Sequence, residues 1–404
     1  MTFEELYRTM LKQAVERGSV QADDLEASAG HLDCLLHPQD HPLVWPLNPC
    51  TCPKEETHCA AACLFDAIVR RDDGTLAVDP DRCSGCGACI QACQSGNLTA
   101  SRDVLPALDA VKHAKGPVYA LIAPAFLGQF STVVTPGRLR SAFKLLGFTG
   151  MVEVALFADL LTLKEALEFD RNIHTETDFQ LTSCCCPMWI GMIRKLYHEL
   201  MPHVPGAVSP MIAAGRTVKK LHPDAVTIFV GPCIAKKAEA READLAGAVD
   251  YVLTFQEMQD IFQAADIHPE LLEESERDHS SRAGRIYART GGVSEAVRTT
   301  VARLHPERPI QVRTRQADGV PACRAMIEDI RSGQHQANFF EGMGCTGGCV
   351  GGPKVLLDRE TGRENVDRYG DEAEFSTPLD NPYVLKLLRL LGFDTVEEFL
   401  EQSD

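Results

Sequence analysis

Apolar residues recur at the spacing of a helix near the start of the chain. Between residues 4 and 17 they stand mostly three or four positions apart, at Leu6, Met10, Leu11 and Val15. Gly18 follows directly, and glycine is the residue that most often ends a helix. The pattern predicts an amphipathic helix whose apolar face docks on the rest of the protein.

Short apolar runs appear after residue 104 and alternate with helical patterns. The runs predict four strands, at residues 118–122, 151–154, 225–230 and 250–253. Helices are predicted between them, for example at residues 138–146 and 255–264. This alternation is typical of α/β layers in which helices pack on a mixed or parallel sheet. No apolar stretch is long enough to cross a bilayer, so no membrane span is expected.

Composition and charge restrict the function further. With 404 residues, 45% hydrophobic and 24% charged, the chain is expected to be an ordinary globular protein of two or three domains. Its net charge of -17 argues against nucleic-acid binding, because such binding requires cations that neutralise phosphates. The first residues carry two glutamates and no sustained apolar stretch, so no secretory signal is predicted and the cytoplasm is the expected compartment.

Sixteen cysteines are present, and a reducing cytosol favours metal binding over disulfides for them. Four form the run C-x2-C-x2-C-x3-C, which wraps a 4Fe-4S cluster in bacterial ferredoxins, at Cys83, Cys86, Cys89 and Cys93. Gly85 and Gly87 let backbone N–H groups turn toward the sulfurs. An upstream group departs from this spacing but ends in the same C-x3-C, at Cys50, Cys52, Cys59 and Cys63. Two 4Fe-4S clusters are therefore predicted.

The ligand sets of these two clusters are predicted to exchange one cysteine, because the last cysteine of each run in two-cluster ferredoxins binds the other cluster. One set is then Cys83, Cys86 and Cys89 with Cys63. The other is Cys50, Cys52 and Cys59 with Cys93. Two alternatives stay open for this second set: Cys34 is a ligand, or either Cys50 or Cys52 is left out. A zinc ribbon would need two C-x2-C knuckles, and this region has a different geometry.

A further metal site is predicted from three loops rich in proline, glycine, serine and lysine. They read Thr-Ser-Cys-Cys-Cys-Pro-Met-Trp at 182–189, Gly-Pro-Cys-Ile-Ala-Lys-Lys at 231–237 and Glu-Gly-Met-Gly-Cys-Thr-Gly-Gly-Cys-Val-Gly-Gly at 341–352. Proline and glycine let the backbone turn tightly around an inorganic core. The candidate ligands are Cys186, Cys233, Cys345 and Cys349. The alternative is a set of isolated buried cysteines, which behave as small hydrophobic residues.

These three loops are similar to the three motifs of the iron-only (FeFe) hydrogenases. Further matching stretches include Ala123-Pro124, Ala158-Asp159 and Thr290-Gly-Gly-Val293. The resemblance implies an α/β fold with a two-lobed hydrogenase catalytic domain that holds the H-cluster and ends in helices, at residues 115–404. It also implies an N-terminal helix with an irregular lead-in at 1–48, followed by an α+β ferredoxin-like domain with two 4Fe-4S clusters at 49–104.

The same resemblance implies the cofactor and the roles of individual side chains. The four loop cysteines would hold a 4Fe-4S cubane, and Cys349 would bridge to a two-iron subsite that carries carbonyl, cyanide and an azadithiolate. Lys236 would anchor an anionic ligand, Cys185 would relay protons, and Met343 would pack over the bridging-ligand face. Other residues implied to bind the cofactor are Ala123, Pro124, Ser183, Pro232 and Gly348. The alternatives are a packed thiol for Cys185 and a surface lysine for Lys236, as is expected for Lys237.

Two glutamates of a predicted helix match the relay carboxylates of the family. Glu165 and Glu168 stand at i and i+3 on one helix face, for which a solvated surface is the alternative. Pro205 falls where the relay path has a serine, and proline has no hydroxyl to carry protons. The usual route is therefore interrupted at one step.

Other departures also indicate a divergent branch of the family. Cys184 is an extra cysteine in the first loop, so the relay thiol beside it could be displaced. Gly231 stands where methionine is usual, and Ala125 replaces a common serine.

The predicted function is the reversible conversion of two protons and two electrons into H2, with the two 4Fe-4S clusters relaying electrons to or from ferredoxin or a similar carrier. A hydrogen-sensing regulatory hydrogenase with slow turnover and a non-catalytic iron-sulfur scaffold are the alternatives. Dedicated maturation enzymes would install the two-iron subsite. Because ferredoxins are acidic and the chain carries a net charge of -17, docking is expected at a local basic patch, with the candidates Arg70, Arg71, Lys112 and Lys115.

Overall fold

The N-terminal helix docks on the body of the protein as predicted. The computed structural model describes residues 1–22, 25–50, 52–53, 57–72, 75–182, 185–275 and 279–401. Helix α1 (Phe3–Arg17) begins at a capping box formed by Thr2 and Glu5 and ends at Gly18, whose φ is 77°. Its apolar face packs on α5 (Val104–His113) and α11 (Phe255–Ala264), where the Tyr7 hydroxyl donates to Asp260 at 3.2 Å.

The segment that follows α1 contains more regular structure than predicted. It includes α2 (Ala29–Leu36), the 3-10 turn η2 (Pro38–Asp40) and strand β1 (Val44–Pro46), which pairs antiparallel with β4 (Leu98–Ala100). The expected irregular lead-in is wrong here, because such short elements show no hydrophobic period. Strand β1 precedes residue 49 and yet pairs within the cysteine-dense region, so this pair crosses the predicted domain boundary.

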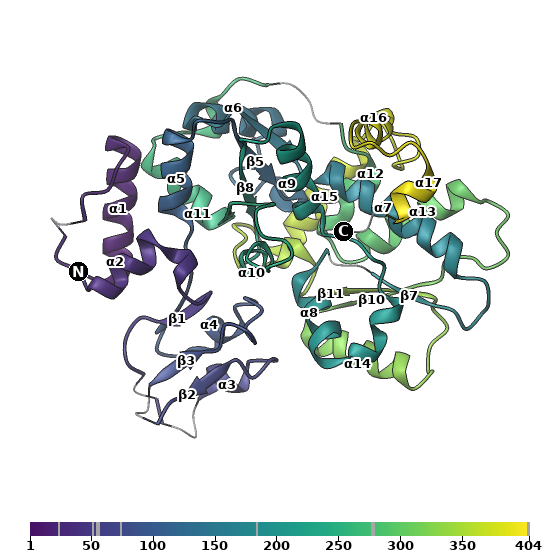
Figure 1. Ribbon diagram of the computed structural model, residues 1–404, viewed down its shortest axis with the longest axis horizontal. Coiled ribbons are helices and arrows are strands. Elements are labelled where there is room, and N and C mark those ends of the chain that lie inside the picture. Colours follow the sequence, from purple (N-terminus) through teal and green to yellow (C-terminus); the bar gives the residue numbers. More distant parts are fainter. Residues whose placement is uncertain are drawn as a thin grey trace.

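The cysteine-dense region is a small α+β unit, drawn at the lower left of Figure 1. Its further elements are α3 (His58–Ala61), α4 (Ala88–Ala92) and the antiparallel strands β2 (Ile68–Arg70) and β3 (Leu76–Val78). The core of this unit combines a few apolar side chains with cysteines, namely Val44, Leu76, Val78, Leu98, Cys59 and Cys89. An apolar core this small supplies little stability, so the fold of the unit depends on the groups that the cysteines bind.

The first of two parallel sheets has the order β6-β5-β8-β9. Its strands are β5 (Val118–Ile122), β6 (Gly150–Glu153), β8 (Val226–Gly231) and β9 (Tyr251–Thr254), each within one residue of the predicted strand. Helices α6 (Pro136–Leu146), α9 (Pro210–Leu221) and α11 pack on this sheet. The α/β prediction is confirmed for this lobe.

The second parallel sheet was not predicted from the sequence. Its order is β10-β11-β7, with β7 (Gln180–Leu181), β10 (Thr314–Asp318) and β11 (Phe339–Met343). Its neighbouring helices are α8 (Pro187–Leu196), α13 (Gly292–Leu304) and α14 (Val320–Arg331). Figure 1 shows the two sheets as separate lobes, with the loops before α8 and α10 between them.

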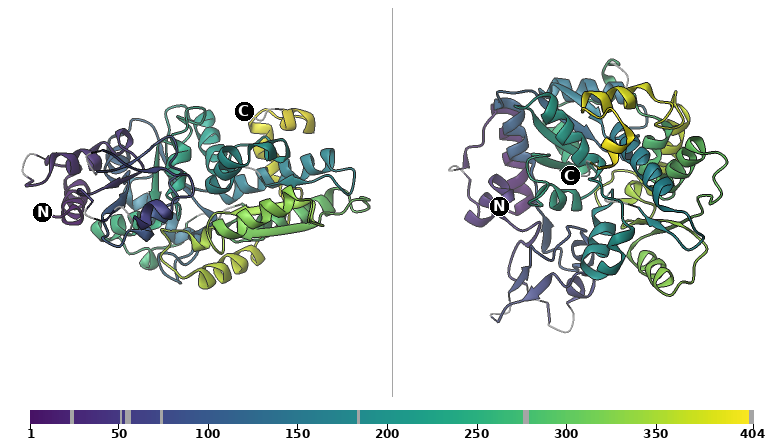
Figure 2. Two further views of the ribbon diagram at one scale, coloured as in Figure 1. Left: turned by 90° about the horizontal axis from the view of Figure 1, so that it is seen from below. Right: turned by 45° about the vertical axis from the view of Figure 1, so that its right-hand side comes forward.

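Helix α7 (Ala155–Asn172) joins the lobes and is buried along most of its length. One side of it, including Phe157 and Leu160, belongs to the core of the first lobe, whereas Ala158 and Leu161 belong to the core of the second. In both views of Figure 2 the purple N-terminal helices lie at the left, opposite the yellow C-terminal helices that pack on α7. The remaining helical elements are η4 (Pro124–Phe126), η5 (His198–His203), α10 (Ala235–Ala240), η6 (Pro269–Leu271), α12 (Arg282–Arg285), η7 (Ile286–Ala288), η8 (Cys349–Gly351), α15 (Arg359–Asp371), α16 (Pro382–Leu390) and α17 (Val396–Glu401).

Among the helices of the described residues, none combines the length and the apolar character that a membrane span requires.

Candidate active site and iron-sulfur sites

The candidate site lies where the carboxyl ends of the two parallel sheets meet. Ala123 and Pro124 follow β5, Pro232 and Cys233 follow β8, and Met343 is the last residue of β11. The loop after β7 carries Cys185 and Cys186, and η8 begins at Cys349. Ligands of parallel α/β sheets bind beyond the carboxyl ends of the strands, because the loops that gather there can converge.

A cavity of about 60 Å³ occupies this position. Eight of the residues predicted at the site line it, namely Ala123, Pro124, Cys185, Pro232, Cys233, Lys236, Met343 and Cys349. The rest of the lining is mostly apolar, so the cavity can keep water away from a bound group. Gly348 is predicted to bind the cofactor but is not part of this lining; its amide donates to the Cys345 carbonyl at 3.0 Å. Ser183 and Cys184 fall outside the described residues.

The four loop cysteines lie close enough to influence one another's ionisation. Burial, followed by repulsion from neighbouring thiols, raises the pKa of Cys233 to about 11 and that of Cys349 to about 12. The same causes raise the pKa of Cys345 well above its usual value, with Cys186 among the neighbours. Buried thiols of this kind stay protonated unless a metal replaces the protons, which iron does because a coordinated thiol is deprotonated.

The four loop cysteines offer one thiolate for each iron of a four-iron cluster. In the part of the chain that the structure describes, no three His, Cys, Asp or Glu side chains converge closely enough for one ion. A four-iron cluster needs no such convergence, since each thiolate binds a different iron atom. The Gly344 amide also donates to Cys186 Sγ at 3.3 Å, and such N–H groups stabilise cluster-bound sulfur. The identity of the ligands stays a prediction.

Lys236 is buried between the cavity and a carboxylate, so the surface alternative does not apply to it. It is 8% exposed, and its Nζ lies 2.5 Å from Glu239 Oε2 on the same helix, α10. Burial raises the pKa of Cys233 and of Cys349, and the positive charge of Lys236 opposes this rise. An ammonium in this position can hold an anionic group in the cavity by a charge-assisted hydrogen bond.

Phe229 occupies the space beside Gly231, where the family usually has methionine. A Cβ at residue 231 would lie 2.6 Å from Phe229 Cε1 and 3.0 Å from Ala123 Cβ. Because Phe229 itself lines the cavity, its ring supplies the apolar surface that the absent side chain would give. The departure at Gly231 is therefore compensated within the site.

Tyr287, in η7, also lines the cavity and was not among the predicted site residues. It is 5% exposed, and its hydroxyl lies 2.9 Å from Thr162 Oγ1 on α7. Its place just before the matching stretch Thr290-Gly-Gly-Val293 was the available signal in the sequence. Spacing alone could not show that the ring turns into the cavity.

The two predicted relay glutamates differ in burial. Glu165 on α7 is fully buried, whereas Glu168 is half-buried and its pKa is raised by burial against the opposing effect of Lys164 and Arg171. A fully solvated helix face is excluded for Glu165. Pro205 lines a separate cavity of about 370 Å³, together with Ser209 and Glu239. The relay role of both glutamates stays a prediction.

The N-terminal cysteines divide into two groups by their electrostatic neighbours. The charges of Cys50 and Cys93 both influence the ionisation of Cys52 and of Cys59. The Asn97 amide also donates to Cys93 Sγ at 3.3 Å. The charge of Cys63 instead influences the ionisation of the three thiols of the other group, Cys83, Cys86 and Cys89. This grouping agrees with the predicted exchange of the last cysteines. Cys34, the alternative ligand, is buried on α2, and the charged group that influences its ionisation is Asp33.

The group that contains Cys63 lies directly against the four-cysteine site. A Cβ at Gly85 would come within 3.1 Å of Ala235 Cα, and Ser84 Oγ lies 3.0 Å from the Met188 sulfur. The charge of Cys86 also influences the ionisation of Cys345. The three groups of cysteines therefore form a series that starts in the N-terminal unit and ends at the cavity.

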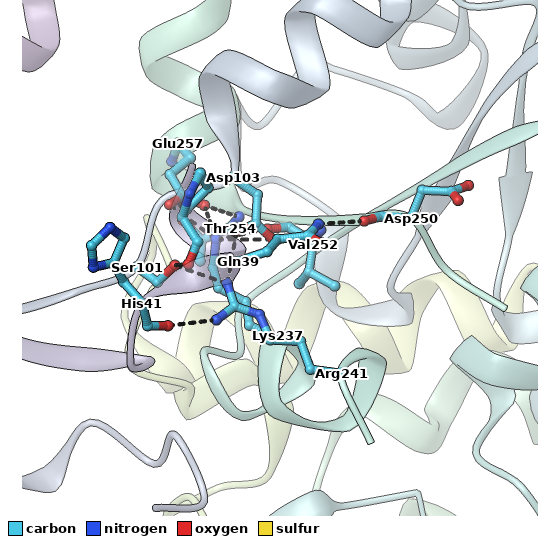
Figure 3. Close-up of polar contacts among 11 residues, drawn as sticks. Gln39, His41, Ser101, Asp103, Lys237, Arg241, Asp250, Val252, Thr254 and Glu257 are labelled. Atoms are coloured by element: carbon cyan, nitrogen blue, oxygen red, sulfur yellow. Dashed lines mark hydrogen bonds and ion pairs between the residues drawn. The ribbon is translucent and has the colours of Figure 1, made fainter. Parts of the chain in front are cut away.

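A buried ionic network fixes α10 to the N-terminal segment (Figure 3). Lys237 was expected at the surface, but its side chain is fully buried and its Nζ lies 2.7 Å from the Val252 carbonyl and 3.1 Å from Glu257. Arg241 donates to Asp103 at 3.3 Å and to Ser101 at 2.9 Å. The expectation for Lys237 is wrong because consecutive residues of a helix point in different directions, Lys236 toward the cavity and Lys237 into this network.

The four cations proposed for docking do not form one patch. Arg70 donates to the Cys52 carbonyl at 3.2 Å, and Arg71 is exposed beside it. Lys112 instead binds the Ala14 carbonyl at the end of α1, at 2.6 Å. Figure 1 places the end of α5, which carries Lys112, far from β2. The single basic patch is therefore wrong, and Arg70 and Arg71 are the pair beside the outer cysteine group.

Comparisons with known proteins agree with this geometry. The family described as "Iron only hydrogenase large subunit, C-terminal domain" matches residues 116–353, and the 4Fe-4S binding domain matches residues 76–99. Iron hydrogenase 1 of Clostridium pasteurianum is 28% identical over 275 residues, which are 58% of this chain and 48% of that protein. The NADP-reducing hydrogenase subunit HndD of Solidesulfovibrio fructosivorans is 25% identical over 365 residues, 76% of this chain and 62% of that protein.

The chain thus spans about half to three fifths of these two relatives. Among solved structures, an FeFe-hydrogenase HydA studied during stepwise H-cluster assembly has a TM-score of 0.60 at 23% identity. That likeness covers 71% of this chain and 94% of the other. A variant of HydA1 from Chlamydomonas reinhardtii gives the same TM-score at 21% identity. These likenesses show the two-lobed α/β fold with its N-terminal ferredoxin-like region.

Proposed function

The chain belongs to the iron-only hydrogenase family, and from this we propose that it interconverts H2 with two protons and two electrons. The observation that carries the proposal is the set of side chains around one small cavity. Two of the four loop cysteines line it, together with Cys185, Lys236 and Met343. A scaffold that held only a cubane would have no use for a thiol, an ammonium and a thioether facing a small, mostly apolar cavity.

The residues that would hold the H-cluster are Cys186, Cys233, Cys345 and Cys349. When bound, the cofactor supplies an open iron position and an adjacent base, which heterolytic cleavage of H2 requires. The chain itself holds an ammonium at the cavity through Lys236 and Glu239, 2.5 Å apart, and keeps the surroundings apolar. The Cys185 thiol is the group of the chain that exchanges protons there.

Electrons are proposed to move through two 4Fe-4S clusters. The inner one would be held by Cys63, Cys83, Cys86 and Cys89, and the outer one by Cys50, Cys52, Cys59 and Cys93. The order is supported by the contact between Gly85 and the loop before α10. Ferredoxin or a similar carrier would dock at the outer cluster, where Arg70 and Arg71 offer positive charge to an acidic partner.

Pro205 supports a slow or sensory hydrogenase as the second candidate. The residue removes a hydroxyl from the expected proton route, and a missing hydroxyl slows proton exit without changing the cofactor. Maturation enzymes would still be needed to install the two-iron subsite. The cytoplasm is the proposed compartment, because thiols of iron-sulfur sites require reducing surroundings.

Infrared spectroscopy of the anaerobically matured protein tests the proposal. We expect bands of metal-bound carbonyl and cyanide that shift when H2 is admitted. Cys349→Ala should abolish these bands, whereas Cys34→Ala, which removes a buried cysteine outside all three groups, should leave them in place. Wild-type protein without such bands after competent maturation would leave the scaffold as the correct function.

A further inference from the structure

A second cavity lies between α7, α9 and the C-terminal helices, and it shares no lining residue with the cavity at the four-cysteine site. Its volume is about 260 Å³, and most of its lining is apolar, including Leu160 and Leu161 of α7 and Phe399 of α17. Helix α17 packs on α7 beside it. An apolar cavity of about 150 Å³ takes up benzene, so this larger space has room for an acyl chain of about eight carbons.

The charged side chains among the described residues of this lining are all cations, namely Lys164 of α7 and Arg216 and Lys220 of α9. Lys164 is 5% exposed, and its Nζ lies 6.0 Å from the centre of the Phe399 ring. Burial raises the pKa of Glu168 and Lys164 opposes this rise, so these two charges lie near each other, but Glu168 is not part of the lining. Positive charge gathered in this way, in a chain of net charge -17, favours an anionic group in the cavity.

The hydrogen bonds of the two cations on α9 leave their charges unneutralised. Lys220 Nζ donates to the Leu391 carbonyl at 2.6 Å, and Arg216 donates to the Asp244 carbonyl at 3.1 Å. An ammonium has three N–H donors and a guanidinium has five, so each cation keeps donors for a ligand. Lys220 is exposed, whereas Leu160 and Leu161 are buried, so the cavity runs from a charged surface end to an apolar inner end.

We propose that this cavity binds a free monocarboxylate with an acyl chain of about eight carbons. The chain lies among the apolar side chains of α7 and α17, where its burial supplies most of the affinity. The carboxylate accepts charge-assisted hydrogen bonds from the cations of the lining. The inference does not depend on the proposed hydrogenase function, because the two cavities are lined by different residues.

The first experiment is isothermal titration calorimetry of the full chain, purified anaerobically, with octanoate as the probe. We expect saturation at one octanoate per chain. Each buried methylene group changes the affinity about fourfold, so hexanoate, which is two methylene groups shorter, should bind roughly fifteenfold more weakly. The alcohol 1-octanol has the same chain without the charge and should bind about tenfold more weakly than octanoate.

The second experiment compares three variants. Lys220→Met removes an exposed cation and should weaken octanoate about tenfold while leaving 1-octanol unchanged. Lys386→Met is the matched control, because Lys386 is exposed on α16 and is not part of the lining. Ala213→Leu places a larger side chain in the lining and should remove the binding of both probes.

The proposal is overturned if octanoate and hexanoate bind equally well, or if Lys220→Met and Lys386→Met bind octanoate alike. It is also overturned if Ala213→Leu, with the circular dichroism spectrum of the wild type, still binds octanoate. Lys220→Met is decisive by itself, because an exposed side chain can be replaced without disturbing the core. Sedimentation with phosphatidylglycerol vesicles, without binding of free octanoate, would identify a membrane lipid as the ligand and refute the free carboxylate. Missing carbonyl and cyanide bands would refute the hydrogenase function and leave these results unchanged.

Discussion

Lys237→Met tests whether the buried network of Figure 3 holds α10, and with it Lys236, in place. The substitution removes the ammonium at nearly constant side-chain volume. Glu257, 3.1 Å from Nζ, and Asp103, 4.0 Å away, then remain buried without this cation. Neither carboxylate can move into water, because both are less than a tenth exposed.

The expected cost follows from the partners that remain. Removing one member of a buried ion pair typically costs about 3–5 kcal/mol. Here Glu257 still accepts from the Thr254 amide at 2.7 Å, and Asp103 still accepts from the Val252 amide at 3.1 Å and from Arg241. We therefore expect the lower end, about 3 kcal/mol, which is roughly a hundredfold change in the ratio of folded to unfolded protein.

The assay is anaerobic urea unfolding followed by far-ultraviolet circular dichroism, with three variants compared. Lys12→Met is the matched control, because Lys12 and Glu16 form an exposed pair at 3.7 Å that is worth at most about 0.5 kcal/mol. Lys237→Met combined with Glu257→Gln should regain much of the lost stability, since no carboxylate is left unpaired at that position. The reasoning is refuted if Lys237→Met costs no more than Lys12→Met, or if the double variant is no more stable than Lys237→Met.

Two further predictions concern electron delivery. Gly85 and Gly96 both have a positive φ, 70° and 63°, so alanine at either position lowers the stability of the fold by about 1 kcal/mol. Of the two, only Gly85 is placed so that an added Cβ would come within 3.1 Å of Ala235 Cα. Gly85→Ala should therefore slow stopped-flow reduction of the inner site far more than Gly96→Ala, and equal rates would contradict the inner contact. Arg71→Glu should raise the apparent KM for ferredoxin severalfold and leave a viologen assay unchanged, because exposed charges act mainly on association. Lys115→Glu is the control at the distant exposed position; a similar effect of both would remove the outer cluster as the docking place.

The sequence was sufficient wherever one local signal determined the structure. The four strands of the first sheet are buried apolar runs, and their carboxyl ends carry the loops of the site. The spacing of Cys83, Cys86 and Cys89 likewise leaves little choice of cluster type. The second sheet escaped prediction because β7 has two residues and β10, which reads Thr-Arg-Gln-Ala-Asp, is mostly polar. Pairing with β11 makes strands of them, and that is a long-range contact.

Side-chain direction was the second quantity that spacing could not supply. Lys236 and Lys237 are chemically identical and adjacent, so composition gave no reason to expect both to be buried with different partners. Their roles depend on Glu239 and on Glu257, and the second of these comes from another helix. Tyr287 was missed for the same reason, since the partner of its hydroxyl is Thr162, 125 residues earlier in the chain.

The unusual spacing at Cys50 and Cys52 leaves the two cysteine groups complete, whereas the departure at Pro205 falls on the predicted proton route. All eight cysteines of the two predicted clusters fall into two complete groups, and the inner group touches the loop that carries Cys233. On the proton side, Pro205 replaces the serine hydroxyl expected on the predicted route, and it lines a separate cavity of about 370 Å³. If the proposed route runs through Glu165 and Glu168, the loss of that hydroxyl makes proton exit the slow step. The rate of this protein should then depend on solvent deuterium and on the region near Glu168 more than on the potential of the electron donor.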